Sequence, residues 1–258
     1  MAAATGYYLP GSTWLHRRNP ITKLLALGLV LLAAFLLPPA TLPALVVAMF
    51  VTGWSAGLSR PLVRSLRIPF LLLTSIVVVN ALFFPSAREV LWSFGPFVLS
   101  REGLTFGLVS GGRLIAAFLA SVLFLFTTLA DDLLEGLVSR GVSHRLAFVV
   151  LSSVQMVPRM QARAGAILDA QQARGLPVTG SLGHRLRALV PLIGPVVLGS
   201  LIDVRERTFA LEARGFGSRP QRSSYRIVGD PPVDRWLRLL IMVGAVGVVV
   251  AAVLGPAW

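Results

Sequence analysis

Residues Leu239 to Trp258 read LLIMVGAVGVVVAAVLGPAW and contain no charged side chain. An α-helix rises about 1.5 Å per residue, so a run of about 20 apolar residues can cross the hydrocarbon core of a bilayer. Four earlier stretches are similarly apolar: residues 21–37, 38–59, 68–84 and 103–130. Only Lys23 and Arg113 interrupt them. The sequence therefore predicts an all-α polytopic membrane protein with about five transmembrane helices.

The composition agrees with this class. Of the 258 residues, 55% are hydrophobic and 14% are charged, whereas soluble domains contain about 25% charged residues. Lys and Arg number 24 against 11 Asp and Glu, and there is no cysteine. In a soluble protein this basic excess would suggest nucleic-acid binding, but here it lies between apolar runs, as in cytoplasmic loops of membrane proteins. We therefore expect the protein to lie in a lipid bilayer and to bind no nucleic acid. Because the chain has no cysteine, it can form neither disulfides nor thiolate metal sites.

The positions of the basic residues predict the orientation. Every lysine and arginine except Arg88, Arg101 and Arg113 lies in or beside three segments: residues 1–21, 59–67 and 131–235. Because basic residues concentrate on the cytoplasmic side, we expect a multi-pass protein of the bacterial plasma membrane with a cytoplasmic N-terminus. The expected domains are a four-span membrane domain (1–130), a cytoplasmic helical domain (131–235) and a C-terminal transmembrane helix (236–258).

Residues 131–235 are predicted to contain one short and two long helices. Asp131 or Asp132 can cap a short helix that stops at Gly141. Long helices are expected over residues 145–174 and 189–214. In each, residues spaced by three, four or seven positions share one helical face. The first face carries Met156, Met160, Ile167, Gln171 and Arg174, and the second carries Val197, Val204, Thr208 and Leu211.

Both long helices are predicted to end in the same tripeptide. One finishes QQARG at residues 171–175 and the other LEARG at residues 211–215. A glycine at this place supplies the left-handed residue that stops a helix, and an arginine in the last turn interacts favourably with the helix dipole. A single Ala-Arg-Gly would carry little weight in an arginine-rich chain. Two copies at the ends of two long helices indicate a shared role.

With these motifs the sequence resembles the T component of energy-coupling-factor (ECF) importers of vitamins and metal ions. That family has paired Ala-Arg-Gly motifs at the ends of two cytoplasmic coupling helices, which match Ala173-Arg174-Gly175 and Ala213-Arg214-Gly215. Further matching positions are Asn19-Pro20-Ile21-Thr22-Lys23, where an acid is commoner than Asn19, then Thr127-Thr128, Asp132-Leu133 and Pro158. The resemblance covers most of residues 15–217.

The resemblance implies a non-catalytic coupling subunit. Its expected partners are two cytoplasmic ABC ATPase subunits and one small membrane subunit that binds the substrate. Arg174 and Arg214 would anchor the two helices on the two ATPases. The sequence agrees with a non-catalytic role, because a P-loop needs a lysine after its glycines and the only lysine, Lys23, lies at the start of the first apolar run. We expect no cofactor and no metal, with ATP bound by the partner subunits.

The fourth apolar run carries two further candidate features. Gly103, Gly107 and Gly111 recur every four residues, a pattern that lets helices approach closely in membranes. They are candidates either for packing within the chain or for docking of the substrate-binding subunit. Arg113 is a candidate functional residue because a charge inside the bilayer is costly. It could pair with Asn80 or reach outward, and in either case we expect its side chain to avoid lipid.

Two other functions fit parts of the sequence. A membrane scaffold could use the basic block 131–235 to bind anionic lipid or another complex. A conventional ABC permease subunit would share the coupling principle, but only a fragment of its Glu-Ala-Ala loop is present, at Glu212-Ala213. The transported substrate is not encoded in any motif of this chain.

Overall fold

The computed structural model describes residues 8–84, 90–94, 97–175, 182–216 and 229–254. The chain forms two compact units, which we name the membrane unit (residues 1–137 and 228–258) and the two-helix unit (residues 138–227). The units divide at 137/138 and 227/228, slightly inside the expected cytoplasmic segment 131–235. The reason is that residues near both ends of that segment, such as Gly136 and Asp234, contact the start of the first helix.

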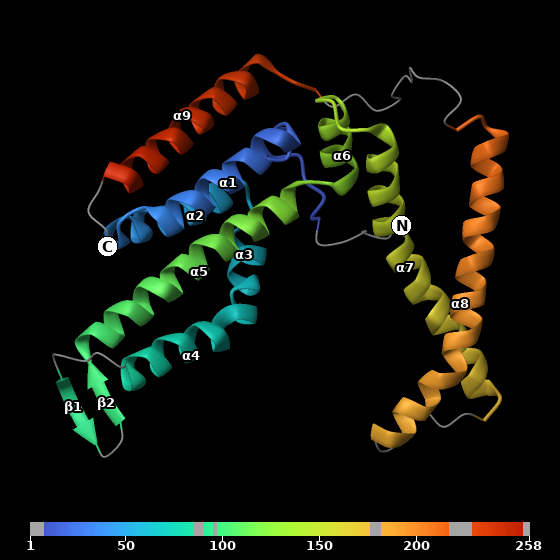
Figure 1. Cartoon of the computed structure of the whole chain (residues 1–258), viewed down its shortest axis with the longest axis horizontal. Helices are drawn as coiled ribbons and strands as arrows, with labels where there is room; N and C mark the ends of the chain where they lie inside the picture. Colours follow the sequence, from blue (N-terminus) through green and yellow to red (C-terminus); the bar gives the residue numbers. More distant parts are fainter. Residues whose placement is uncertain (1–7, 85–89, 95–96, 176–181, 217–228, 255–258) are drawn as a thin grey trace. The chain divides into compact units, whose positions relative to one another are not determined.

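Helices dominate the described part of the membrane unit (Figure 1). They are α1 (Pro20–Leu36), the 3-10 turn η1 (Pro39–Thr41), α2 (Leu42–Ser55), α3 (Ser59–Ser65), α4 (Arg67–Phe83), α5 (Arg101–Thr127), α6 (Ala130–Val138) and α9 (Pro232–Leu254). The predicted short helix is α6, although it starts at Ala130, so that Asp131 and Asp132 lie in its first turn. A hairpin of β1 (Val90–Phe94) and β2 (Phe97–Ser100) precedes α5, with antiparallel pairing. The sequence pattern had not indicated these strands.

Apolar helices of membrane-spanning length confirm the all-α membrane class. By length and composition, α5 with 27 residues and α9 with 23 residues can each cross a bilayer. Helices α3 and α4 meet at a 47° bend and qualify together as a third span. Helix α1 and the η1–α2 segment are apolar but shorter, because Pro38 and Pro39 end one helix and start the next. The count of five spans therefore stays a prediction.

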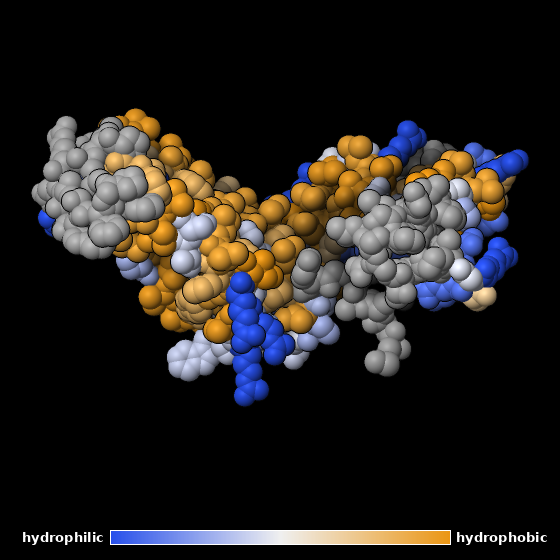
Figure 2. All heavy atoms as spheres, turned by 90° about the horizontal axis from the view of Figure 1, so that it is seen from below, coloured by the Kyte–Doolittle hydropathy of each residue, from blue (hydrophilic) through white to orange (hydrophobic). Residues whose placement is uncertain are grey.

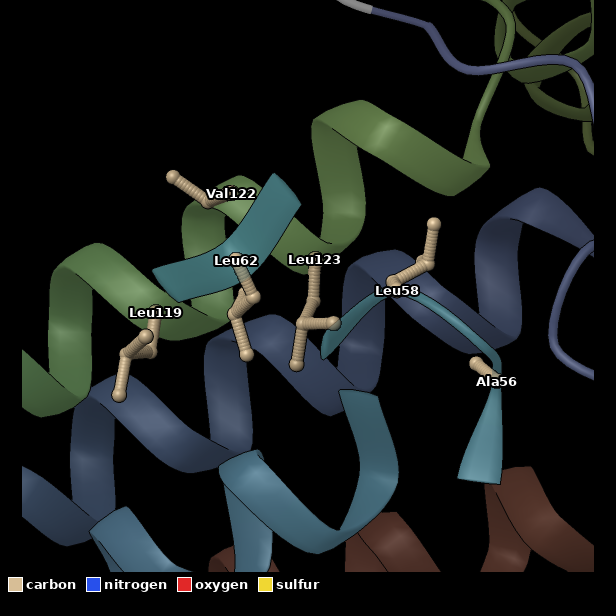
Figure 3. Packing of buried hydrophobic residues seen from close by; sticks show 6 residues of the cluster. All are labelled: Ala56, Leu58, Leu62, Leu119, Val122 and Leu123. Carbon is tan, nitrogen blue, oxygen red and sulfur yellow. The ribbon is translucent and has the colours of Figure 1, made fainter. Parts of the chain in front are cut away.

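Helix α5 lies at the centre of the membrane unit and contacts α1, α2, α3 and α4. One buried cluster joins the α2–α3 connection and α3 to the C-terminal half of α5: Ala56, Leu58, Leu62, Leu119, Val122 and Leu123 (Figure 3). Gly57, with a φ of +68°, makes the tight turn that brings α3 back towards α5. Helix α9 packs along α1, so the first and last helices of the chain are neighbours (Figure 1).

Large apolar side chains cover much of the surface (Figure 2). Leu71 in α4 and Val253 in α9 are 79% and 77% exposed. Soluble monomers rarely present continuous apolar surface of this kind, whereas a bilayer solvates it without cost. The exposed faces of α4 and α9 are therefore the ones expected to contact lipid.

The two-helix unit consists, in its described part, of α7 (His144–Ala173) and α8 (Leu182–Ala213). Helix α7 confirms the long helix expected at 145–174. Helix α8 ends where expected but begins seven residues before the predicted start at 189. Its prolines, Pro191 and Pro195, lie within the helix and do not define its start.

Candidate functional site

The two Ala-Arg-Gly motifs form the C-terminal caps of α7 and α8. Gly175 and Gly215 have φ angles of +88° and +69°, in the left-handed region. The Gly175 N–H donates to the Gln172 carbonyl at 2.9 Å, and the Gly215 N–H donates to the Glu212 carbonyl at 2.9 Å. After α8 the Phe216 N–H also donates to the Leu211 carbonyl at 2.9 Å, which completes a Schellman motif. Both glycines are thus required by the backbone.

The arginines of these motifs lie at the exposed ends of their helices. The side chains of Arg174 and Arg214 are exposed. Among the described residues neither arginine forms an ion pair. A guanidinium carries five N–H donors in a fixed fork and binds carboxylates in a bidentate way. An exposed guanidinium at the end of each helix is therefore available to a carboxylate.

A bidentate ion pair joins the C-terminal halves of the two helices. Arg163 Nη1 lies 2.8 Å from Asp203 Oδ2, and Arg163 Nη2 donates to Asp203 Oδ1 at 2.9 Å. The hydrogen bond from Arg163 lowers the pKa of Asp203, and the nearby charges of Arg163, Arg159 and Arg207 lower it further. Sequence periodicity had not singled out this pair, because its partners belong to two helices whose register is not locally encoded.

The two helices run in opposite directions. Near the start of α7, the ring of Phe148 lies 4.7 Å from the ring of Phe216, which follows α8. Phe148 precedes Arg163 in the sequence, whereas Phe216 follows Asp203. The two contacts therefore pair an earlier part of α7 with a later part of the chain around α8. The two helices are therefore antiparallel, and Figure 1 shows that they cross. Consequently Arg174 and Arg214 lie at opposite ends of the pair.

The expected helix faces are only partly buried. On α7 Met160 is exposed, whereas Met156 and Ile167 are half-buried. On α8 Val197, Val204 and Thr208 are exposed. Apolar side chains on both helices are thus open to contact by another protein or by lipid.

A polar cluster joins the starts of α1 and α9 in the membrane unit. Asn19 caps α1, because its side-chain oxygen accepts a hydrogen bond from the Ile21 N–H at 3.0 Å. The Asn19 N–H donates to Asp234 Oδ2 at 2.9 Å, and Arg18 Nη1 lies 3.4 Å from Asp234 Oδ1. The side chain of Asp234 is fully buried. The sequence signal for Asp234 is an acid in the first helical turn before an apolar run.

Lys23 caps the end of α5. Its Nζ donates to the Thr127 carbonyl at 2.6 Å, and the residue is 8% exposed. Buried cations are stabilised at the C-terminal end of a helix by the unpaired carbonyls and the dipole. This bond brings the start of α1 to the end of α5.

The glycines of α5 face α4. A Cβ added at Gly107 would lie 3.0 Å from the Val77 Cα, and one at Gly111 would lie 3.6 Å from Val77 Cγ2. A Cβ at Gly103 would overlap the carbonyl of Asn80. This geometry supports the helix-packing alternative, and docking of a partner subunit on these glycines stays a prediction.

Arg113 is half-buried near the middle of α5. Its Nε is buried without a hydrogen-bond partner among the residues that the structure describes. Asn80, the partner in one of the two alternatives for Arg113, donates its side-chain amide to the Ile76 carbonyl at 2.8 Å. The role of Arg113 stays a prediction.

The family model described as "Cobalt transport protein", CbiQ, matches residues 11–225 of this sequence. The match extends from before α1 to beyond α8 and includes both Ala-Arg-Gly motifs. The chain belongs to the CbiQ family. Many relatives of this CbiQ member are named "energy-coupling factor transporter transmembrane protein EcfT". The one from Lacticaseibacillus paracasei is 30% identical over 86% of this chain and 88% of its own length. Those from Brevibacillus brevis and Bacillus subtilis are 30% and 26% identical, over 83% and 86% of this chain and 84% and 87% of their own lengths. The protein is thus a membrane transport component of the ECF type.

Proposed function

We propose that this protein is the non-catalytic coupling subunit of an ECF-type, ATP-driven importer of a vitamin or a metal ion. One observation carries the proposal: two antiparallel helices, joined by an ion pair, each end in an exposed arginine held beside a left-handed glycine. Two exposed cations at opposite ends of the α7–α8 pair fit two separate acidic sites. Two ATPase subunits would supply these acidic sites, one for each helix.

In this proposal each of the two arginines, Arg174 and Arg214, anchors its helix on one ATPase. When an ATPase groove closes on the end of a coupling helix, the guanidinium pairs with a carboxylate of that groove. Breaking such a desolvated pair typically costs ~3–5 kcal/mol, so the contact would survive movement of the ATPase. Helices α7 and α8 then transmit the movement to a small membrane subunit that binds the substrate. ATP binds only to the partner ATPases, and this chain holds no cofactor of its own.

The proposed topology has five spans, a cytoplasmic N-terminus and an external C-terminus in a bacterial plasma membrane. Two contacts support it. The Lys23–Thr127 bond and the Asn19–Asp234 bond bring together the start of α1, the end of α5 and the start of α9. In a five-span topology α1 and α9 start on the same side of the membrane, and α5, the fourth span, ends on that side. This topology therefore accounts for the contacts among these three helix ends.

The test is co-purification of the ATPases from native membranes in mild detergent. Arg174→Glu combined with Arg214→Glu should abolish recovery of the ATPases while the protein remains in the membrane. The matched control reverses two other exposed arginines of the same unit, Arg140→Glu with Arg145→Glu, and should retain the ATPases. Full retention by the first variant would overturn the proposal. Equal, salt-sensitive loss in both variants would instead favour a scaffold that binds by general charge.

A further inference from the structure

Arg163 and Asp203 lie at equal distances from the two arginines that end their helices. Arg174 follows Arg163 by eleven positions, and Arg214 follows Asp203 by eleven positions. Eleven residues make about three helical turns, so each ending arginine shares a face with the ion-pair residue of its own helix. They also span about 16 Å. Because the helices are antiparallel, the ion pair lies midway between Arg174 and Arg214.

The bidentate form of this pair constrains more than distance. Two parallel hydrogen bonds between a planar guanidinium and a carboxylate fix the relative orientation of the two side chains. The pair is partly exposed, at 36% for Arg163 and 41% for Asp203. Exposed ion pairs contribute little to folding stability. The pair is therefore suited to define a crossing without being needed to fold the helices.

Gly199 makes room for the guanidinium. A Cβ at this position would lie 2.8 Å from Arg163 Nη1 and 3.3 Å from Arg163 Cζ. Gly199 precedes Asp203 by one helical turn, so the two residues form adjacent parts of one face of α8. A larger side chain at 199 would displace the guanidinium from Asp203 without changing any charge.

The negative charge of Asp203 offsets the repulsion among the arginines around it. Arg159 on α7 and Arg207 on α8 act on this carboxylate together with Arg163, and Glu206 acts on Arg163. An arginine in place of Asp203 would therefore repel Arg159, Arg163 and Arg207. Asp203→Arg should therefore push α7 and α8 apart at this contact. The double change Arg163→Asp with Asp203→Arg should restore the contact.

We propose that the Arg163–Asp203 pair, seated on Gly199, is the pivot of α7 and α8 and sets the positions of Arg174 and Arg214 relative to each other. Arg163, Asp203 and Gly199 are positioning residues for the ends of the helices. The pivot itself is independent of the proposed transport function. Its consequence for ATPase binding rests on that function.

The pivot is tested by a distance measurement on the full-length protein in lipid nanodiscs. The chain has no cysteine, so spin labels can be placed only at Arg145→Cys and Ala210→Cys, two exposed positions on α7 and α8. A change of about 20° in the crossing angle moves these labels by about 4 Å, which pulsed electron paramagnetic resonance resolves. Asp203→Arg and Gly199→Leu should each shift or broaden the distance distribution. Arg163→Asp with Asp203→Arg should restore the parent distance, and the control Asp169→Arg, at another exposed acid, should not change it.

Co-purification of the ATPases by the same variants links the pivot to function. Asp203→Arg should reduce ATPase recovery, and the exchanged pair should restore it. An unchanged distance in both Asp203→Arg and Gly199→Leu would overturn the pivot, whatever the ATPases do. A shifted and rescued distance with full ATPase recovery in Asp203→Arg would overturn its link to coupling. If the parent protein recovers no ATPase while the distances behave as expected, the proposed function fails and the pivot stands.

Discussion

Asn19 and Asp234 are joined by a hydrogen bond of 2.9 Å, although 215 positions separate them in the chain. Asn19 caps α1 through its side chain and, through its own N–H, binds the carboxylate in the first turn of α9. Asp234 is also paired with Arg18. One buried carboxylate thus fixes the starts of α1 and α9 in a common position.

Asp234→Ala should destabilise the protein. The change leaves the buried Asn19 N–H and the partly exposed Arg18 without their acceptor, and hydrogen bonds to charged groups contribute about 1.5–3 kcal/mol each. We expect a loss of about 2–4 kcal/mol, seen as a lower melting temperature in detergent. Asp169→Ala, at an exposed position of α7, should leave the melting temperature unchanged. Equal melting temperatures for both variants would mean that the cluster does not hold α9 to α1.

Several parts of this structure were readable from the sequence for physical reasons. The ends of α7 and α8 were predicted because Gly175 and Gly215 encode a local left-handed stop. The long apolar runs predicted the membrane class because burial in lipid depends on composition alone. The Arg163–Asp203 pair could not be predicted, since the register of two helices is set by packing along their whole length. The contact of Lys23 with the Thr127 carbonyl could not be predicted either, since the two residues lie 104 positions apart in sequence.

Replacing Gly175 or Gly215 by alanine should weaken the helix ends without unfolding the helices. An L-residue in the left-handed region costs about 1–2 kcal/mol. The cap would relax towards an ordinary φ and change the direction of Arg174 or Arg214. We expect weaker co-purification of the ATPases with unchanged helix content by circular dichroism. Gly165→Ala is the control, since that glycine lies within α7 with open space around it and the change should raise helix stability slightly.

The Arg163–Asp203 pair should tolerate acid to a lower pH than an ordinary carboxyl pair. The hydrogen bond from Arg163 lowers the pKa of Asp203 below the usual 3.8. A lowered pKa means that the pairing is fully present above the usual value and is lost as the pH falls through the lower one. The spin-label distance between positions 145 and 210 should therefore stay constant from pH 7 to pH 5 and change only below about 3.8. Asp203→Asn removes the titrating group, so its distance should not vary over this acid range. A change in the parent protein between pH 7 and pH 5 would contradict the prediction.

Gly107→Leu should separate α5 from α4 in the isolated protein. A side chain at this position meets the backbone of Val77, with the Val77 Cα at 3.0 Å and the Val77 carbonyl oxygen at 3.2 Å. Backbone cannot rotate away as a side chain can, and overpacking of this kind typically costs about 1–3 kcal/mol. We expect a lower melting temperature for the purified protein without any partner. Gly247→Leu in α9, where no atom lies within 4 Å of an added Cβ, provides the matched control. If Gly107→Leu melts like the parent yet no longer recovers the small membrane subunit, the glycines of α5 serve docking and not internal packing.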